Sequence, residues 1–208
     1  MTCLAFLLAL ALLVGCADGP DPAAGVPAKR AASAGAAAPP LEPNAAPVPA
    51  RPATAQESTS IEGTEERIDL RLVTVDDVPL PFSTYVPADW SDETANSGEG
   101  AAVRFAMGEG VVTVFMPSEP NRDGIGEIAR AVAESNGDAR PLEPAQAWVR
   151  SGYTFGGNGQ TGSVRVGEHA GLPFYVVEQY PYEMGDGFAP RAALVLNRLR
   201  WSDDGTAL

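Results

Sequence analysis

The stretch AAVRFAMGEGVVTVFMP, residues 101–117, carries the strongest fold signal in the chain. Two apolar segments flank Gly108-Glu109-Gly110, and the second is rich in β-branched side chains. Glycine readily adopts the positive φ that a tight turn needs, so this pattern is typical of a β-hairpin. We therefore expect two antiparallel strands here and interpret the segments on either side in relation to them.

Four more strands are expected around this hairpin. Before it, residues 66–75 alternate apolar and polar side chains with the period of two that is typical of a half-buried strand, and residues 80–87 follow after a turn. After it, residues 162–169 and 172–182 form a second predicted strand pair, joined at Gly171. The sequence thus predicts about six strands.

Two helices are expected in the same part of the chain. Residues 123–137 carry apolar side chains at helical spacing, and Gly137 suits a left-handed stop. Residues 189–201 form the second helix, with Pro190 in its first turn. The apolar faces are Ile125, Ile128, Ala129, Val132 and Ala133 in the first helix, and Ala192, Val195, Leu196 and Leu199 in the second. Residues 145–155 are ambiguous. This order predicts an α+β fold, in which an antiparallel sheet of about six strands has two main helices packed on it.

The residues before this region have a different composition. Ala and Pro make up 24 of the 40 residues from 17 to 56, and no aromatic residue occurs between Phe6 and Phe82. Such a stretch cannot bury enough apolar surface to offset the entropy of ordering it. We therefore expect residues 16–63 to form a disordered tether and residues 64–208 to form a single α+β domain.

The first residues predict export and lipid attachment. Residues 4–14 form an unbroken apolar run of eleven residues, which suits a signal peptide but is too short to span a bilayer. The sequence Leu13-Val14-Gly15-Cys16 overlaps the end of this run and resembles the lipobox of bacterial lipoproteins. The apolar run lacks the Lys or Arg that usually precedes it in that family. An ordinary signal peptide that ends near a cysteine is the alternative.

The resemblance to bacterial lipoproteins implies a signal peptide over residues 1–15, cleavage between Gly15 and Cys16, and acyl chains such as palmitate on the sulfur of Cys16. Two or three acyl chains are enough for stable membrane anchoring. The domain would then lie on the extracytoplasmic side of the cell envelope, and Ala17 favours the outer membrane in a bacterium with two membranes. Cys3 would leave with the signal peptide, so the mature chain would keep no free thiol.

Charge and side-chain inventory argue against several classes of function. The chain has 27 Asp and Glu residues against 14 Lys and Arg residues, a net charge of −13, and an acidic surface repels nucleic-acid backbones. The single histidine, His169, makes two-histidine zinc ligation impossible. Residues 119–124 resemble the front of a calcium loop, but Arg130 stands where a carboxylate is needed. No metal, cofactor or nucleic acid is expected.

Catalytic motifs in the sequence are weak. The GGNGQTG segment, residues 156–162, contains a G-x-G-x-x-G match, but a strand pattern follows it, so we expect a hairpin loop. His169 could act as a base for Ser163 or Ser151, yet no G-x-S-x-G elbow is present and we expect an exposed turn histidine. The neighbouring acids are expected in solvated turns: Asp76-Asp77, Asp92-Glu93 and Asp203-Asp204.

Aromatic side chains remain as candidates for a binding surface. Phe174 and Tyr175 should point to opposite faces of their strand, because successive strand residues alternate. Tyrosine is favoured at interfaces, so Tyr175, together with Tyr153, is the candidate pair of ligand-binding residues. Partial burial under a loop is the alternative.

The order of elements over residues 68–201, from FSTYVPADW at 82–90 to the closing LRW, resembles the PsbP/Mog1-like α/β sandwiches. The resemblance implies binding of protein partners without catalysis. We therefore predict a membrane-anchored envelope lipoprotein with a non-enzymatic domain that binds a protein or another envelope component. An envelope hydrolase that uses Ser163 or an acidic pair is the alternative.

Overall fold

The structure is a computed structural model that describes residues 48–61, 63–119 and 122–208. These residues belong to one compact unit. The predicted signal peptide, the lipobox with Cys16, and residues 16–47 of the predicted tether lie outside the described residues.

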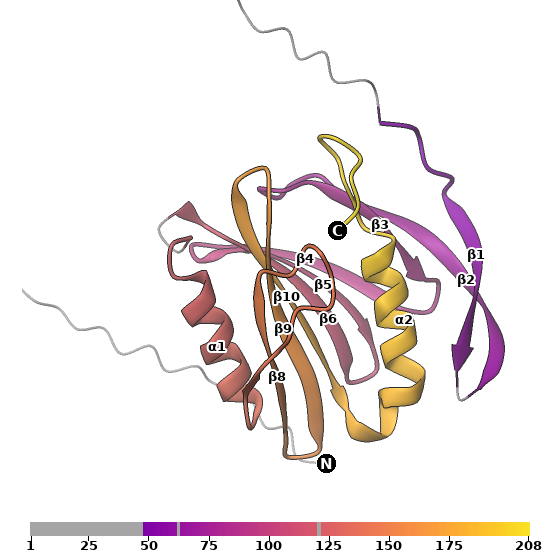
Figure 1. Cartoon of the computed structure of the whole chain (residues 1–208). Helices are drawn as coiled ribbons and strands as arrows, with labels where there is room; N and C mark the ends of the chain where they lie inside the picture. The colour runs from indigo at the N-terminus through magenta and orange to yellow at the C-terminus, as the bar shows by residue number, and fades with distance from the viewer. Residues whose placement is uncertain (1–47, 62, 120–121) are drawn as a thin grey trace, which may run out of the picture. The chain divides into compact units, whose positions relative to one another are not determined.

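The described residues form two antiparallel sheets (Figure 1). The smaller sheet has the strand order β1-β2-β3-β11, with β1 at Thr54–Ile61, β2 at Thr64–Val75, β3 at Phe82–Pro87 and β11 at Arg200–Trp201. The larger sheet has the order β4-β5-β6-β10-β9-β8-β7. Its strands are β4 at Ser91–Ser97, β5 at Gly100–Met107, β6 at Gly110–Pro117, β7 at Arg140–Pro141, β8 at Ser151–Gly157, β9 at Gln160–His169 and β10 at Leu172–Pro181.

Two α-helices cover opposite faces of the larger sheet. Helix α1, Ile125–Asn136, packs on β8, β9 and β10, whereas helix α2, Gly185–Asn197, packs between the larger sheet and the smaller one (Figure 1). Strand β10 separates the two layers: Phe174 and Val176 face the main core with α2, and Tyr175 and Val177 face α1. This confirms the predicted alternation and the α+β fold class with two helices packed on antiparallel strands. The single sheet of about six strands is wrong, because the strands divide into a four-stranded and a seven-stranded sheet.

The hairpin at residues 101–117 forms as predicted. Strands β5 and β6 pair in register up to Met107 and Gly110, and Gly108 adopts a positive φ of 57° in the turn. Glycine is required at position 110 for a different reason. A Cβ atom at this position would collide with the ring of Phe188 on α2. Gly110 therefore also leaves room for Phe188 of the C-terminal helix.

The predicted C-terminal helix exists, but its bounds differ from the prediction. Helix α2 begins at Gly185, directly after the short 3-10 helix η2, Tyr182–Met184, so Pro190 lies inside the helix and not in its first turn. The earlier start brings Phe188 onto the helix, where it is fully buried and stacks on Trp90. Trp201 lies in strand β11 and not in the helix.

Strand β4 was not predicted. Its sequence, SDETANS, is exposed at every position, and Asp92 and Glu93 lie on this strand and not in the predicted turn. An exposed edge strand buries neither face, so it has no apolar alternation from which a strand can be predicted. It forms because it pairs along its whole length with β5. The ambiguous residues 145–155 contribute strand β8 from Ser151 onward.

The N-terminal boundary of the domain also differs. Residues 54–61, which were assigned to the tether, form strand β1 and pair with β2. Ahead of the strand, the Arg51 guanidinium donates hydrogen bonds to Ser83 and to the carbonyl of Arg198, and it lies over the ring of Tyr85. The domain therefore begins at or before Arg51. A polar strand is stabilised here because its partner supplies the apolar side chains Ile68 and Leu70.

Candidate functional site

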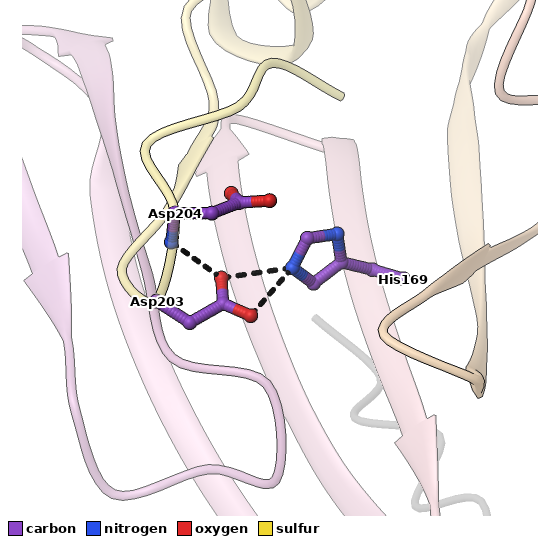
Figure 2. Close-up of side chains that lie close together, drawn as sticks. All are labelled: His169, Asp203 and Asp204. Atoms are coloured by element: carbon purple, nitrogen blue, oxygen red, sulfur yellow. Dashed lines mark hydrogen bonds and ion pairs between the residues drawn. The ribbon is translucent and has the colours of Figure 1, made fainter. Parts of the chain in front are cut away.

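The structure brings the single histidine, His169, together with the acidic pair Asp203 and Asp204 (Figure 2). His169 is the last residue of β9, and the two aspartates lie in the turn after β11. The Nε2 atom of His169 lies 2.8 Å from one carboxylate oxygen of Asp203 and 3.0 Å from the other. The site joins elements that are 34 residues apart in the chain.

Packing holds the imidazole ring of His169 in place. The ring stacks on the indole of Trp201, with centroids 4.6 Å apart and planes 13° from parallel. Trp201 is buried and makes edge contacts with Phe82 and Phe174, so it is part of the main core. Only 12 % of the His169 side chain is exposed. The prediction of an exposed turn histidine is therefore wrong, because Trp201 covers one face of the ring.

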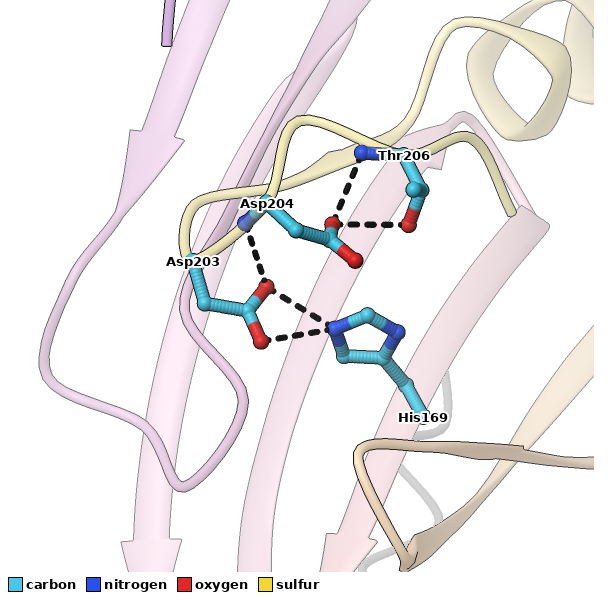
Figure 3. Close-up of polar contacts among 4 residues, drawn as sticks. All are labelled: His169, Asp203, Asp204 and Thr206. Atoms are coloured by element: carbon cyan, nitrogen blue, oxygen red, sulfur yellow. Dashed lines mark hydrogen bonds and ion pairs between the residues drawn. The ribbon is translucent and has the colours of Figure 1, made fainter. Parts of the chain in front are cut away.

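The C-terminal turn positions the two aspartates (Figure 3). The Asp204 backbone N–H donates to the Asp203 carboxylate, and both the backbone N–H and the hydroxyl of Thr206 donate to Asp204 Oδ1. The hydrogen bonds from Thr206 lower the pKa of Asp204, with a smaller contribution from nearby His169. Asp204 is thus a carboxylate at neutral pH, and its other oxygen takes no part in these hydrogen bonds.

The serines considered as nucleophiles lie away from this site. Ser163 precedes His169 by six residues on the same strand, which corresponds to about 20 Å. Its hydroxyl is buried and has no hydrogen-bond partner among the described residues. Ser151 lies opposite Val166, three residues along β9 from His169, or about 10 Å. The structure therefore places neither serine within hydrogen-bond reach of the histidine.

The two candidate ligand-binding tyrosines lie on the sheet face that α1 covers. Tyr175 is buried and stacks on Phe115 with centroids 4.8 Å apart, while Tyr153 is half-buried in the same cluster. Burial, followed by the charge of Glu99, raises the pKa of Tyr175 to about 12. A cavity of about 250 Å³ lies beside Tyr175. Ligand binding by Tyr153 and Tyr175 stays a prediction.

The glycine motif forms the expected hairpin loop. Asn158 and Gly159 connect β8 to β9, and their φ values of 51° and 80° are those of a tight two-residue turn. No helix follows, so the backbone amides that bind a pyrophosphate in dinucleotide-binding proteins are not presented here. In the partial calcium-loop match, Asn121 lies outside the described residues.

No family model matches the chain, and no curated protein matches it. Among solved structures, the chain is similar to LpqN, a protein involved in cell envelope biogenesis of Mycobacterium tuberculosis. The sequence identity is 11%, the TM-score is 0.39, and the match covers 64% of this chain and 91% of that one. A similarity at this level carries no argument for fold or function.

Helices long and apolar enough to cross a membrane do not occur among the described residues.

Proposed function

We propose that the protein is a lipoprotein of the cell envelope, anchored through acyl chains on Cys16, with a folded domain that binds a partner and does not catalyse a reaction. The observation that carries the proposal is the Leu13-Val14-Gly15-Cys16 sequence at the end of an apolar run of eleven residues. A run of this length suits an export signal, and the cysteine supplies the acyl acceptor.

The residues after Cys16 support this proposal. Residues 17–47 are rich in Ala and Pro and contain no aromatic side chain, a composition that suits a spacer between an anchor and a domain. Fully extended, these residues would reach on the order of 95 Å, at about 3.1 Å per residue. A domain on such a spacer can contact partners away from the membrane surface.

Two features favour binding over hydrolysis. Neither Ser163 nor Ser151 lies near the histidine that would activate it. A hydrolase that used the acidic pair at 203–204 would need one carboxyl group with a raised pKa to act as the general acid. The pKa of Asp204 is lowered, so this carboxyl group does not meet that requirement. The partner that we propose is a protein or another component of the envelope.

Replacing Cys16 with serine is expected to abolish lipid attachment. Serine keeps the size of the side chain but removes the sulfur that accepts the acyl group, so the unprocessed precursor should accumulate. The measurement is incorporation of labelled palmitate into the protein in growing cells, together with its size on a gel. Cys3→Ser is the matched control, because it removes the other cysteine of the chain and should keep full labelling. Labelled Cys16→Ser protein would contradict the proposal.

A further inference from the structure

We propose that His169, Asp203 and Asp204 form a binding site for a divalent transition-metal ion, with Zn²⁺ as the ion that best fits these ligands. The proposal does not depend on the lipid anchor. It starts from the position of one imidazole nitrogen and two carboxylates at the end of β9 and in the C-terminal turn (Figure 2).

The ligand atoms are close enough for one ion to bind all three after small movements of the side chains. One ligand atom from each of the three residues lies within 4.8 Å of the others. Ligand atoms that sit about 2.0 to 2.1 Å from a tetrahedral Zn²⁺ are about 3.3 Å from one another. The distances of 2.8 and 3.0 Å between His169 Nε2 and the Asp203 oxygens are slightly below that spacing. A metal ion can therefore replace this hydrogen bond with a small separation of the two groups.

The kinds of ligand select among metals. Ca²⁺ and Mg²⁺ prefer sites made of oxygen atoms, whereas an imidazole nitrogen favours Zn²⁺ and its transition-metal neighbours. One histidine and two aspartates supply three ligands, which leaves the fourth tetrahedral position for water or for a group from a partner. The site thus has the open coordination that a site for metal-mediated contact with another molecule needs.

Neighbouring contacts hold the three ligands in place. The His169 ring is stacked on Trp201, so little side-chain freedom is left to lose when a metal binds. Hydrogen bonds from Thr206 orient Asp204, and the Asp204 N–H orients Asp203 (Figure 3). Contacts of this kind around ligands are typical of metal sites, where they fix the ligand orientation. From the sequence alone no metal is expected, because a single histidine excludes two-histidine zinc ligation and nothing indicates that His169 lies beside Asp203 and Asp204.

The test is a titration of the full chain, purified in detergent without a polyhistidine tag and freed of metal with a chelator. Zn²⁺ added in a calorimeter is expected to bind saturably with one ion per chain. His169→Gln and Asp203→Asn should each weaken binding by about tenfold or more. The matched control is Asp76→Asn. Asp76 is an exposed acid that also neighbours a second acid, but it does not belong to the group of His169, Asp203 and Asp204. The control should bind like the unchanged protein.

A second measurement needs no variant. Because His169 is the only histidine of the chain, its ring nitrogens give the single imidazole signals in a nitrogen-15 NMR spectrum. Zn²⁺ is expected to shift the Nε2 signal in step with the calorimetric saturation. Absence of saturable binding, an unshifted Nε2 signal, or equal binding in the His169→Gln and Asp203→Asn proteins would each overturn the proposal.

Discussion

Replacing Phe188 with alanine is expected to lower the free energy of unfolding by about 3 to 5 kcal/mol, the usual range for truncating a buried phenylalanine. Phe188 is fully buried at the junction of α2 and the larger sheet. Its ring stacks on Trp90 at 5.1 Å between centroids and contacts Tyr180 at 5.0 Å. The backbone of Gly110 packs directly on the ring. Because glycine has no side chain, Gly110 cannot fill the cavity that the Phe188→Ala substitution would leave.

Urea unfolding of a soluble chain that starts at Val48 measures this loss. Tyr182→Ala is the matched control, because Tyr182 is also aromatic and lies close by in the chain but is 55% exposed. Its replacement is expected to change the free energy of unfolding by about 0.5 kcal/mol or less. If the two variants are equally stable, helix α2 does not close the main core as described.

A chain that starts at Thr64 is expected to be less stable than one that starts at Val48 by about 3 kcal/mol or more. The shorter chain lacks β1, which pairs with β2 at eight positions, and it lacks Arg51, which links β3 to the end of α2. Ile68 and Leu70 lose part of their cover, and a buried aliphatic side chain contributes about 1.5 to 3 kcal/mol. The Glu57–Arg198 ion pair is lost as well.

Thermal unfolding of the two chains measures the difference. A loss of about 3 kcal/mol corresponds to a fall in melting temperature of roughly 6 to 12 °C for a domain of this size. A chain that starts at Ala17 is the control. It should melt together with the one that starts at Val48, because the Ala- and Pro-rich composition of residues 17–47 predicts that they do not pack on the domain. Equal melting temperatures for the Thr64 and Val48 chains would show that β1 contributes nothing to stability.

The predicted elements share one property, which is a strong local pattern. The hairpin at 101–117 has glycines at its turn, and the helix around 125–136 has an apolar stripe at helical spacing. Strand pairs and amphipathic helices of this kind are specified by neighbours in the chain, so a single sequence is enough to place them. The burial of Ala192, Val195 and Leu196 agrees with the apolar face predicted for the last helix. Leu199 is buried as predicted, but it lies after the end of the helix at Asn197.

The strands that were not predicted lack such a local pattern. Strand β1 and strand β4 have polar sequences, TAQESTSI and SDETANS, and each depends on a partner strand for its apolar contacts or its hydrogen bonds. The split into two sheets also follows from packing, because β11 pairs with β3 only when α2 returns the chain to that strand. Local patterns contain no information about such pairing between distant segments.

The candidate site also depends partly on the sequence and partly on tertiary packing. The sequence by itself determined the inventory: one histidine, several acidic pairs that include Asp203-Asp204, and a cysteine after an apolar run. Only the tertiary structure decided that His169 meets Asp203 and Asp204, because stacking on Trp201 aligns the end of β9 with the C-terminal turn. The physical reason is that a contact across 34 residues is specified by core packing around Trp201 and not by any property of the residues next to it in the chain.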